Sequence, residues 1–223
     1  MFIGHFGIGL GVKALDQRIS LGTLFLAAQF VDLLWPSLLL LGVETVEIEP
    51  GITKLTPLNF VSYPISHSLL MTIVWGLLFG LTYWQLRKNL KGALILGLCV
   101  LTHWFLDFVV HRPDLPLHPG ESLMVGLGLW NSVAGTLVVE GLLFVIGILV
   151  YLRVTKAKNR AGVLGFWGLI AFLTVITISN FVGPPPPSAT AVAWVSQAQW
   201  ILIIWAYWID MNRQTRVANG TLN

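Results

Sequence analysis

The sequence predicts an all-α protein, a polytopic membrane helix bundle with six full spans and a short N-terminal helix. Of its 223 residues, 56% are hydrophobic and only 10% are charged, whereas soluble domains carry about 25% charged residues. The mean hydropathy is +0.79. Apolar runs recur at about 20 residues, the length that spans a hydrocarbon core of about 30 Å. We therefore expect lipid, rather than water, to surround most of the chain.

The predicted spans follow one another with short polar connections. A shorter apolar run covers 2–15, and at about 1.5 Å per residue a helix there reaches through most of the hydrocarbon core. Its Gly4, Gly7 and Gly11 share one face, which predicts close helix packing rather than a phosphate-binding loop. The six full spans lie near 19–41, 63–85, 92–111, 126–152, 163–182 and 190–211.

The basic residues predict the orientation of the chain. They occupy every second connection, which the positive-inside rule places in the cytoplasm, so we expect the N-terminus outside and the C-terminus inside. Thirteen Lys and Arg, spread between apolar runs, are too few for a nucleic-acid face, and no nucleic acid partner is expected. The single Cys99 excludes an intrachain disulfide and a cysteine-based zinc site. The basic connections hold Lys13 and Arg18, then 87–91, 153–160 and 213–216.

The stretch LTHWFLDFVVH, residues 101–111, places His103, Asp107 and His111 on one face of an apolar helix. A charge at the centre of a membrane helix costs about 2.5–3.5 kcal/mol, so such residues usually face a partner or a wet cavity. His103 and His111 are about 12 Å apart on an ideal helix, too far for one ion. We therefore predict that His103 and Asp107 together bind the metal. The alternative is that they form a structural hydrogen bond between helices. His111 is left to support the ligands, to bind a second metal or to contact substrate.

Three other segments bring candidate ligands to the same depth. His5 lies near the outer end of the first helix, Asp32 about two thirds of the way across its span, and His67 four residues into a span that begins outside. Histidine nitrogens and carboxylate oxygens bind Zn²⁺ and other first-row metals. We expect a divalent metal ion, Zn²⁺ first with Mn²⁺ or Fe²⁺ as alternatives, held by residues of this layer. Each residue also has a structural alternative: His5 as a histidine at the membrane interface, Asp32 as a polar contact within the bundle, and His67 as a helix cap.

Other polar residues are weaker candidates. Asn131, at the outer end of the fourth span, has the chemistry to donate to a substrate oxyanion. Glu140 lies near the bilayer middle, so it is protonated, bonded to another helix or used to handle protons. The external loop 111–122 adds Asp114, His118 and Glu121, where solvated residues are ordinary.

The N-terminal half resembles a known family. The pattern comprises His5 followed by Phe6-Gly7, Asp32 before Pro36, the His67-Ser68 pair and the H-x3-D from His103 to Asp107. It resembles the YdjM-like membrane-bound, metal-dependent hydrolases over about residues 1–112. The resemblance implies metal or catalytic roles for these five His and Asp residues and a bacterial inner membrane. We predict a single integral membrane domain, 1–223, with a metal-site half at 1–122 and further helices at 123–223.

Three functions remain open on the sequence. The first is a metal-dependent hydrolase that uses metal-activated water on an amphiphilic ester, such as a phospholipid, at the outer leaflet, with Asp107 and His111 as catalytic residues. The second is a metal-ion or proton-coupled transporter, which Pro36 and Glu140 suit. The third is a non-catalytic scaffold whose polar residues hold helices together. A membrane lipid is the expected partner in the first case, as substrate.

Overall fold

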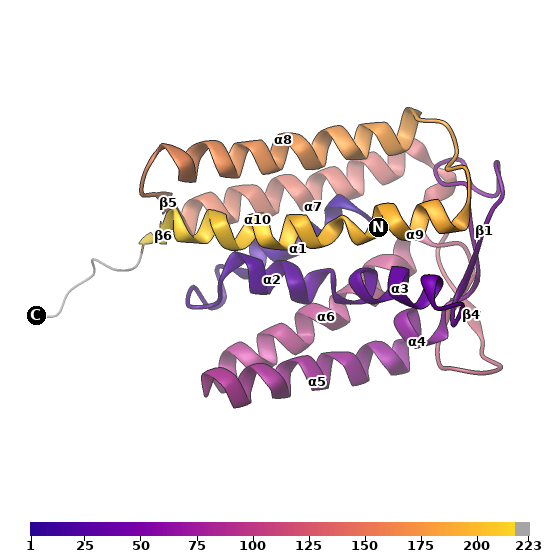
Figure 1. Cartoon of the computed structure of the whole chain (residues 1–223), viewed down its shortest axis with the longest axis horizontal. Helices are drawn as coiled ribbons and strands as arrows, with labels where there is room; N and C mark the ends of the chain where they lie inside the picture. The colour runs from indigo at the N-terminus through magenta and orange to yellow at the C-terminus, as the bar shows by residue number, and fades with distance from the viewer. Residues whose placement is uncertain (217–223) are drawn as a thin grey trace, which may run out of the picture.

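The computed structural model describes residues 1–216 and is an all-α helical bundle, which confirms the predicted fold class (Figure 1). The C-terminus, predicted to be cytoplasmic, lies outside the described residues. The helices are α1 (Ile3–Val12), α2 (Leu21–Ala28), α3 (Phe30–Leu40), α4 (Pro64–His67), α5 (Leu69–Arg87), α6 (Leu90–Val110), α7 (Val133–Val154), α8 (Arg160–Val182), α9 (Ala189–Gln197) and α10 (Gln199–Met211).

The helices match the predicted spans in number and in order. Within residues 1–216, five segments are long and apolar enough to cross a membrane, namely α5, α6, α7, α8 and the continuous pair α9–α10. The predicted span 19–41 is broken, because α2 and α3 meet at Gln29 with a bend of 56°. Counting this pair as one span gives six. The chain is therefore built as an integral membrane protein.

Two predicted boundaries were wrong. Residues 63–67 do not open the second long span but form the separate short helix α4, which Pro64 starts. Residues 126–132 precede the fourth span instead of beginning it, and Asn131 lies in the short 3₁₀ helix Leu129–Asn131. Both segments are apolar enough to look like membrane helix, but the extended backbone of Ser68 separates α4 from α5, and the left-handed Gly128 interrupts the other segment.

Side-chain caps decide where most of the long helices begin. The side-chain oxygen of a Ser or Asn accepts a hydrogen bond from a backbone N–H of the first turn, which has no partner inside the helix. Such a cap therefore fixes the start of a helix whose apolar sequence alone does not define it. The capping residues are Ser20, Ser68, Asn89, Ser132, Asn159 and Ser188.

Glycines allow the helices to approach closely. A Cβ added to Gly7 of α1 would lie 2.6 Å from the carbonyl oxygen of Leu143 in α7. A Cβ on Gly76 of α5 would lie 2.7 Å from the carbonyl oxygen of Gly97 in α6. The predicted close packing of the glycine face of the first helix is thus confirmed.

The two halves of the chain are interleaved rather than separate. Helix α1 packs along α7, α2 packs along α10, and α3 packs along α9. Figure 1 shows α1 and α2 beside α7 and α10, with α5 and α6 along one side of the bundle. Residues 123–216 consequently form part of the wall around any site in the first half.

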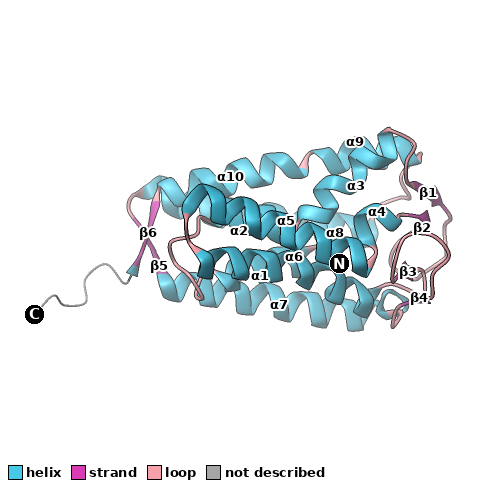
Figure 2. Cartoon of the chain, turned by 90° about the horizontal axis from the view of Figure 1, so that it is seen from below, coloured by secondary structure: helices cyan, strands magenta, loops and turns pink. Residues whose placement is uncertain are grey.

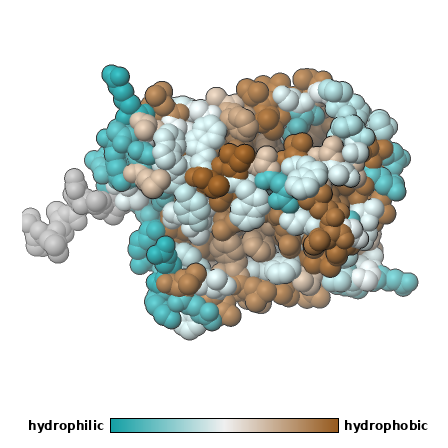
Figure 3. All heavy atoms as spheres, in the orientation of Figure 1, coloured by the Kyte–Doolittle hydropathy of each residue, from teal (hydrophilic) through white to brown (hydrophobic). Residues whose placement is uncertain are grey.

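Small two-stranded sheets close the two ends of the bundle (Figure 2). At one end β1 (Thr45–Ile48) pairs with β2 (Leu58–Ser62), and β3 (Leu115–Pro116) pairs with β4 (Met124–Val125). At the other end β5 (Thr155–Ala157) pairs with β6 (Arg213–Thr215). Hydrophilic residues gather mainly at these ends, with hydrophobic ones between them (Figure 3).

Candidate metal centre

The five predicted ligands converge inside the bundle, toward the end that carries β1 and β2. His5 comes from α1, Asp32 from the first turn of α3, His67 from the end of α4, and His103 and Asp107 from successive turns of α6. Two groups have all their ligand atoms within 4.8 Å of one another: His5, His103 and Asp107, and Asp32, His67 and His103. The residues that the structure describes thus contain buried His/Asp groups able to hold a metal ion.

His103 is at the centre of both groups. Its Nδ1 lies 2.8 Å from the carbonyl oxygen of Ala28, an acceptor that requires Nδ1 to carry the proton. The lone pair of Nε2 therefore points at Asp107 Oδ2, 3.1 Å away, and at Asp32 Oδ1, 3.6 Å away. Nε2 is buried and makes no hydrogen bond within the part of the chain that the structure describes. A backbone carbonyl that fixes the tautomer of a histidine with a free second nitrogen is the usual support for a metal ligand.

His67 is oriented in the same way through a serine. Ser66 Oγ donates to Glu44 Oε2 over 2.6 Å, so its single proton is used. His67 Nδ1, 2.6 Å from the same Oγ, must then be the donor, which leaves Nε2 with a free lone pair. Glu44 also accepts from the backbone N–H of Ile65 and of Ser66, each over 2.8 Å. The buried carboxylate of Glu44 therefore caps α4 and sets the tautomer of His67.

Asp107 has one oxygen committed and one available. Its Oδ1 lies 3.2 Å from His5 Nε2 and 2.6 Å from the α-amino nitrogen of Met1, both of which donate to it. The other oxygen, Oδ2, faces His103 and also lies 3.8 Å from His67 Nε2. The ring of His5 stacks on the ring of His103 with a centroid separation of 3.6 Å. Both rings thus flank the same carboxylate.

The nitrogen–oxygen separations are close to those around a metal ion, and among the described residues the ligand atoms form two groups of three that share His103. An ion with bonds of about 2.0–2.1 Å holds its ligand atoms about 3.3 Å apart. The separations of His67 Nε2 and His103 Nε2 from the carboxylate oxygens of Asp32 and Asp107 run from 3.1 to 3.8 Å. The residues present therefore fit a divalent cation in donor type and in spacing, and the unpaired Nε2 of His103 is accounted for by one.

Charge and burial agree with this fit. The side chains of His5, His67, His103 and Asp107 are almost completely buried, whereas Asp32 is 22% exposed. The α-ammonium group of Met1 offsets one of the two carboxylates, and the remaining negative charge among the imidazoles is one that a cation would compensate in an apolar bundle. Asp32 marks the side from which the site is accessible.

His111 belongs to a second polar cluster next to the five residues. It ends α6, and its Nδ1 lies 3.0 Å from Asp114 Oδ1 and 3.3 Å from the hydroxyl of Tyr63. The Tyr63 hydroxyl also donates to Asp114, and the ring of Tyr63 lies 5.2 Å from that of His67. The ring of Trp130 covers His111 at a centroid separation of 4.2 Å. The structure thus places His111 outside both groups of candidate ligands, in a His–Asp pair beside an aromatic wall.

Of the remaining candidates, Glu140 supports a helix beside the site and three others are exposed. Glu140 of α7 accepts from the backbone N–H of Phe2 over 2.8 Å and of Gly4 over 3.4 Å, so it caps the otherwise uncapped start of α1. This position explains a carboxylate in the middle of an apolar helix and fixes α1 beside the site. His118, Glu121 and Asn131 are exposed and belong to neither group of candidate ligands.

Comparisons of the sequence with family models and with curated proteins, and of the fold with solved structures, find no match. The resemblance to the YdjM-like family accordingly stays a prediction. Sequence reasoning missed Glu44, Ser66 and Tyr63 as parts of the site. Ser66 adjoins the recognised His67, but Glu44 is brought to it only by the packing of its loop against α4.

Proposed function

We propose that this protein is a metal-dependent hydrolase embedded in a membrane, of the kind that the resemblance implies for a bacterial inner membrane. One observation carries the proposal. Two groups of three ligand atoms, from His5, His103 and Asp107 and from Asp32, His67 and His103, share His103 and lie within 4.8 Å of one another in each group. A structural role alone does not require two histidines whose second nitrogens are both held as acceptors.

The residues of the site have different roles in this proposal. Asp32, His67 and His103 would hold the cation, with Asp107 Oδ2 beside them 3.1 Å from His103 Nε2, and the ion when bound would supply a Lewis acid and a lowered pKa for water. His5 hydrogen bonds to Asp107 Oδ1 and holds that carboxylate in place. His111, paired with Asp114 over 3.0 Å, is the group that moves protons, because a carboxylate on Nδ1 raises the basicity of the other nitrogen.

An amphiphilic ester, such as a phospholipid, is the substrate class that the position of the site supports. The site lies toward the end of the apolar bundle at which the chain turns into the small sheets β1–β2 and β3–β4, a depth that corresponds to lipid headgroups. The loop that leads from the His111 cluster to α7 exposes Leu123 and Leu127, 69% and 67% accessible, where lipid contact is favourable.

Elemental analysis by mass spectrometry tests the proposal. We expect about one or two equivalents of Zn, Mn or Fe per chain in the purified wild type. The double variant His103→Ala, Asp107→Ala should lose the metal, whereas His118→Ala, a histidine in an exposed loop, should retain it. Metal-loaded wild type is then assayed on phospholipid and phosphoester substrates. A wild type that binds none of these metals after reconstitution would refute the proposal.

A metal-ion transporter is the second candidate, and one observation favours it. The side chain of Gln29 is fully buried at the break between α2 and α3, and neither of its polar atoms has a hydrogen-bond partner among residues 1–216. Broken membrane helices often carry the binding sites of transporters. Metal uptake into proteoliposomes that is abolished by Gln29→Leu, with no hydrolysis in detergent, would favour this function over the hydrolase.

A further inference from the structure

A basic pocket lies at the end of the bundle opposite to the metal centre. It has a volume of about 290 Å³ and is formed by the connection between α1 and α2 together with the strands β5 and β6. We call it the basic-end pocket. Its charged and hydroxyl-bearing lining includes Lys13, Arg18, Ser20, Lys158, Asp210 and Arg213.

The cations of this pocket are mostly bonded to neutral groups. Lys13 Nζ donates to the carbonyl oxygen of Ile19 over 2.6 Å, and Lys158 Nζ donates to that of Met211 over 3.0 Å. Arg213 is bonded to a carbonyl and a hydroxyl oxygen. Burial lowers the pKa of Arg213, as expected for a cation whose hydration is only partly replaced. These contacts satisfy the donors, but bonds to neutral oxygens do not compensate the charge of the groups.

Two carboxylates offset only part of this charge. Asp210 lies 3.4 Å from Lys13 Nζ and also accepts from the backbone N–H of Leu21. Asp16 is held by Arg18 through two hydrogen bonds of 2.7 and 2.8 Å. With four cations against two carboxylates, the pocket keeps a net charge of about +2, and its apolar surroundings concentrate the resulting field.

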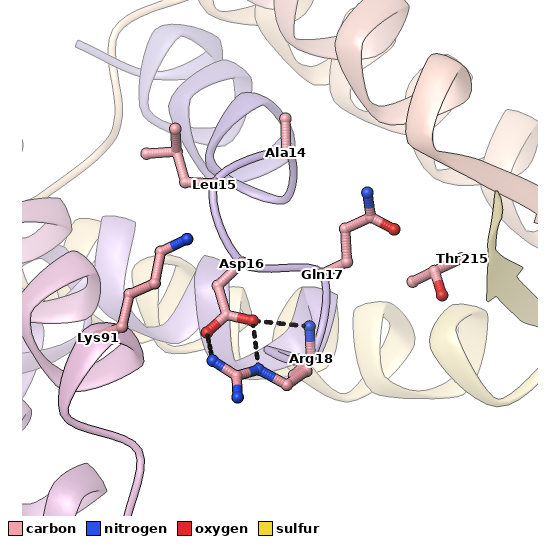
Figure 4. A pocket seen from close by; sticks show the side chains of 7 residues that line it. All are labelled: Ala14, Leu15, Asp16, Gln17, Arg18, Lys91 and Thr215. Carbon is pink, nitrogen blue, oxygen red and sulfur yellow. Dashed lines mark hydrogen bonds and ion pairs between the residues drawn. The ribbon is translucent and has the colours of Figure 1, made fainter. Parts of the chain in front are cut away.

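An adjoining hollow extends the same surface. It shares Gln17, Arg18 and Thr215 with the basic-end pocket and has a volume of about 500 Å³. Figure 4 shows Arg18 folded onto Asp16, with Lys91 of α6 on the other side of Asp16 at the edge of the hollow. The positive surface therefore runs from α6 to β6 across the end of the bundle.

We propose that the basic-end pocket binds the phosphate group of an anionic phospholipid. Lysine and arginine side chains are the usual partners of phosphate oxygens. Ser20 and Thr215 add hydroxyl groups to the same lining. The pocket lies where the apolar helices end, so it meets lipid headgroups of the leaflet that the positive-inside rule makes cytoplasmic. This inference is independent of the metal centre.

The test uses the full-length protein in nanodiscs. Thermal unfolding, followed by the fluorescence of its ten tryptophans, is measured in phosphatidylcholine alone and with increasing phosphatidylglycerol. We expect phosphatidylglycerol to raise the melting temperature of the wild type. Lys158→Gln should weaken the apparent affinity for this lipid about fivefold, the factor that corresponds to one basic side chain at a membrane surface.

Two controls keep the proposal falsifiable. Lys156→Gln removes the same charge from an exposed residue of β5, two positions before Lys158, that does not line the pocket, and should have a smaller effect. Equal effects of the two substitutions would mean general surface attraction and would overturn the proposal. Inorganic phosphate added to the protein in a neutral detergent is the second control. Stabilisation by free phosphate as large as that by the lipid would overturn the phospholipid as occupant.

Discussion

Glu44→Gln is the substitution that most directly tests how the metal centre is built. The glutamine oxygen can keep accepting from the backbone N–H of Ile65 and Ser66, so α4 stays capped. The amide NH₂, however, replaces the oxygen that accepts from Ser66 Oγ. It donates instead, and the Ser66 hydroxyl must turn its proton toward Nδ1 of His67. The neutral imidazole then carries its proton on Nε2, the atom that faces Asp32 and Asp107.

The size of the effect follows from this reversal. The substitution removes no candidate ligand. It changes only the tautomer of His67, so that Nε2 carries a proton and cannot bind a metal. Loss of the groups that orient metal-bound histidines typically costs 10- to 100-fold in metal affinity, which is about 1.4–2.7 kcal/mol. We expect Glu44→Gln to raise the dissociation constant for Zn²⁺ by a factor in this range, with little change in melting temperature of the metal-free protein.

Competition with a chromophoric chelator measures this dissociation constant, and nitrogen NMR of His67 reports the tautomer. Glu47→Gln is the matched control, because Glu47 is an exposed glutamate of the adjacent strand β1. A Glu44→Gln protein that binds Zn²⁺ as tightly as the wild type, with His67 still protonated on Nδ1, would refute the reasoning.

Three further predictions concern different parts of the molecule. Asp107→Asn should abolish hydrolysis and lower metal content while expression is retained; full turnover by the variant would exclude a catalytic role. Gly76→Ala should lower the free energy of unfolding by about 1–3 kcal/mol, seen in thermal melts, because its Cβ would lie 2.7 Å from the Gly97 carbonyl oxygen. Hydrogen bonds from Arg18 lower the pKa of Asp16 below its ordinary value of 3.8. This pair therefore stabilises the fold above pH 3.8 and loses its contribution as the pH falls through the lowered pKa, so the stability gap between wild type and Arg18→Gln should be constant near neutral pH and shrink in acid.

The interleaving of the two halves bears on how the site is maintained. Glu140 on α7 holds the start of α1, and α1 carries His5 to Asp107. A change in the second half of the chain can therefore act on the site without touching any candidate ligand. The predicted metal-site half and the further helices are therefore successive in the sequence but packed together around the site in the structure.

The sequence by itself determined the class of the protein and the layer of the site. Hydropathy fixes the number of spans, because each must match the thickness of a bilayer. Depth along each span can be counted at a constant rise per residue. That count was enough to bring His5, Asp32, His67, His103 and Asp107 to one level.

Only the tertiary structure decided which atoms meet and which tautomers they hold. His103 donates to the carbonyl oxygen of Ala28, which lies at the end of α2 where the helix breaks. His67 is oriented through Ser66 by Glu44, which is more than twenty residues away in the chain. Hydropathy carries no information on rotation about a helix axis or on loop packing, because the lipid-facing and buried sides of these helices are both apolar. The contacts of Glu44, Glu140 and Tyr63 depend on that rotation and packing, so the sequence pattern could not supply them.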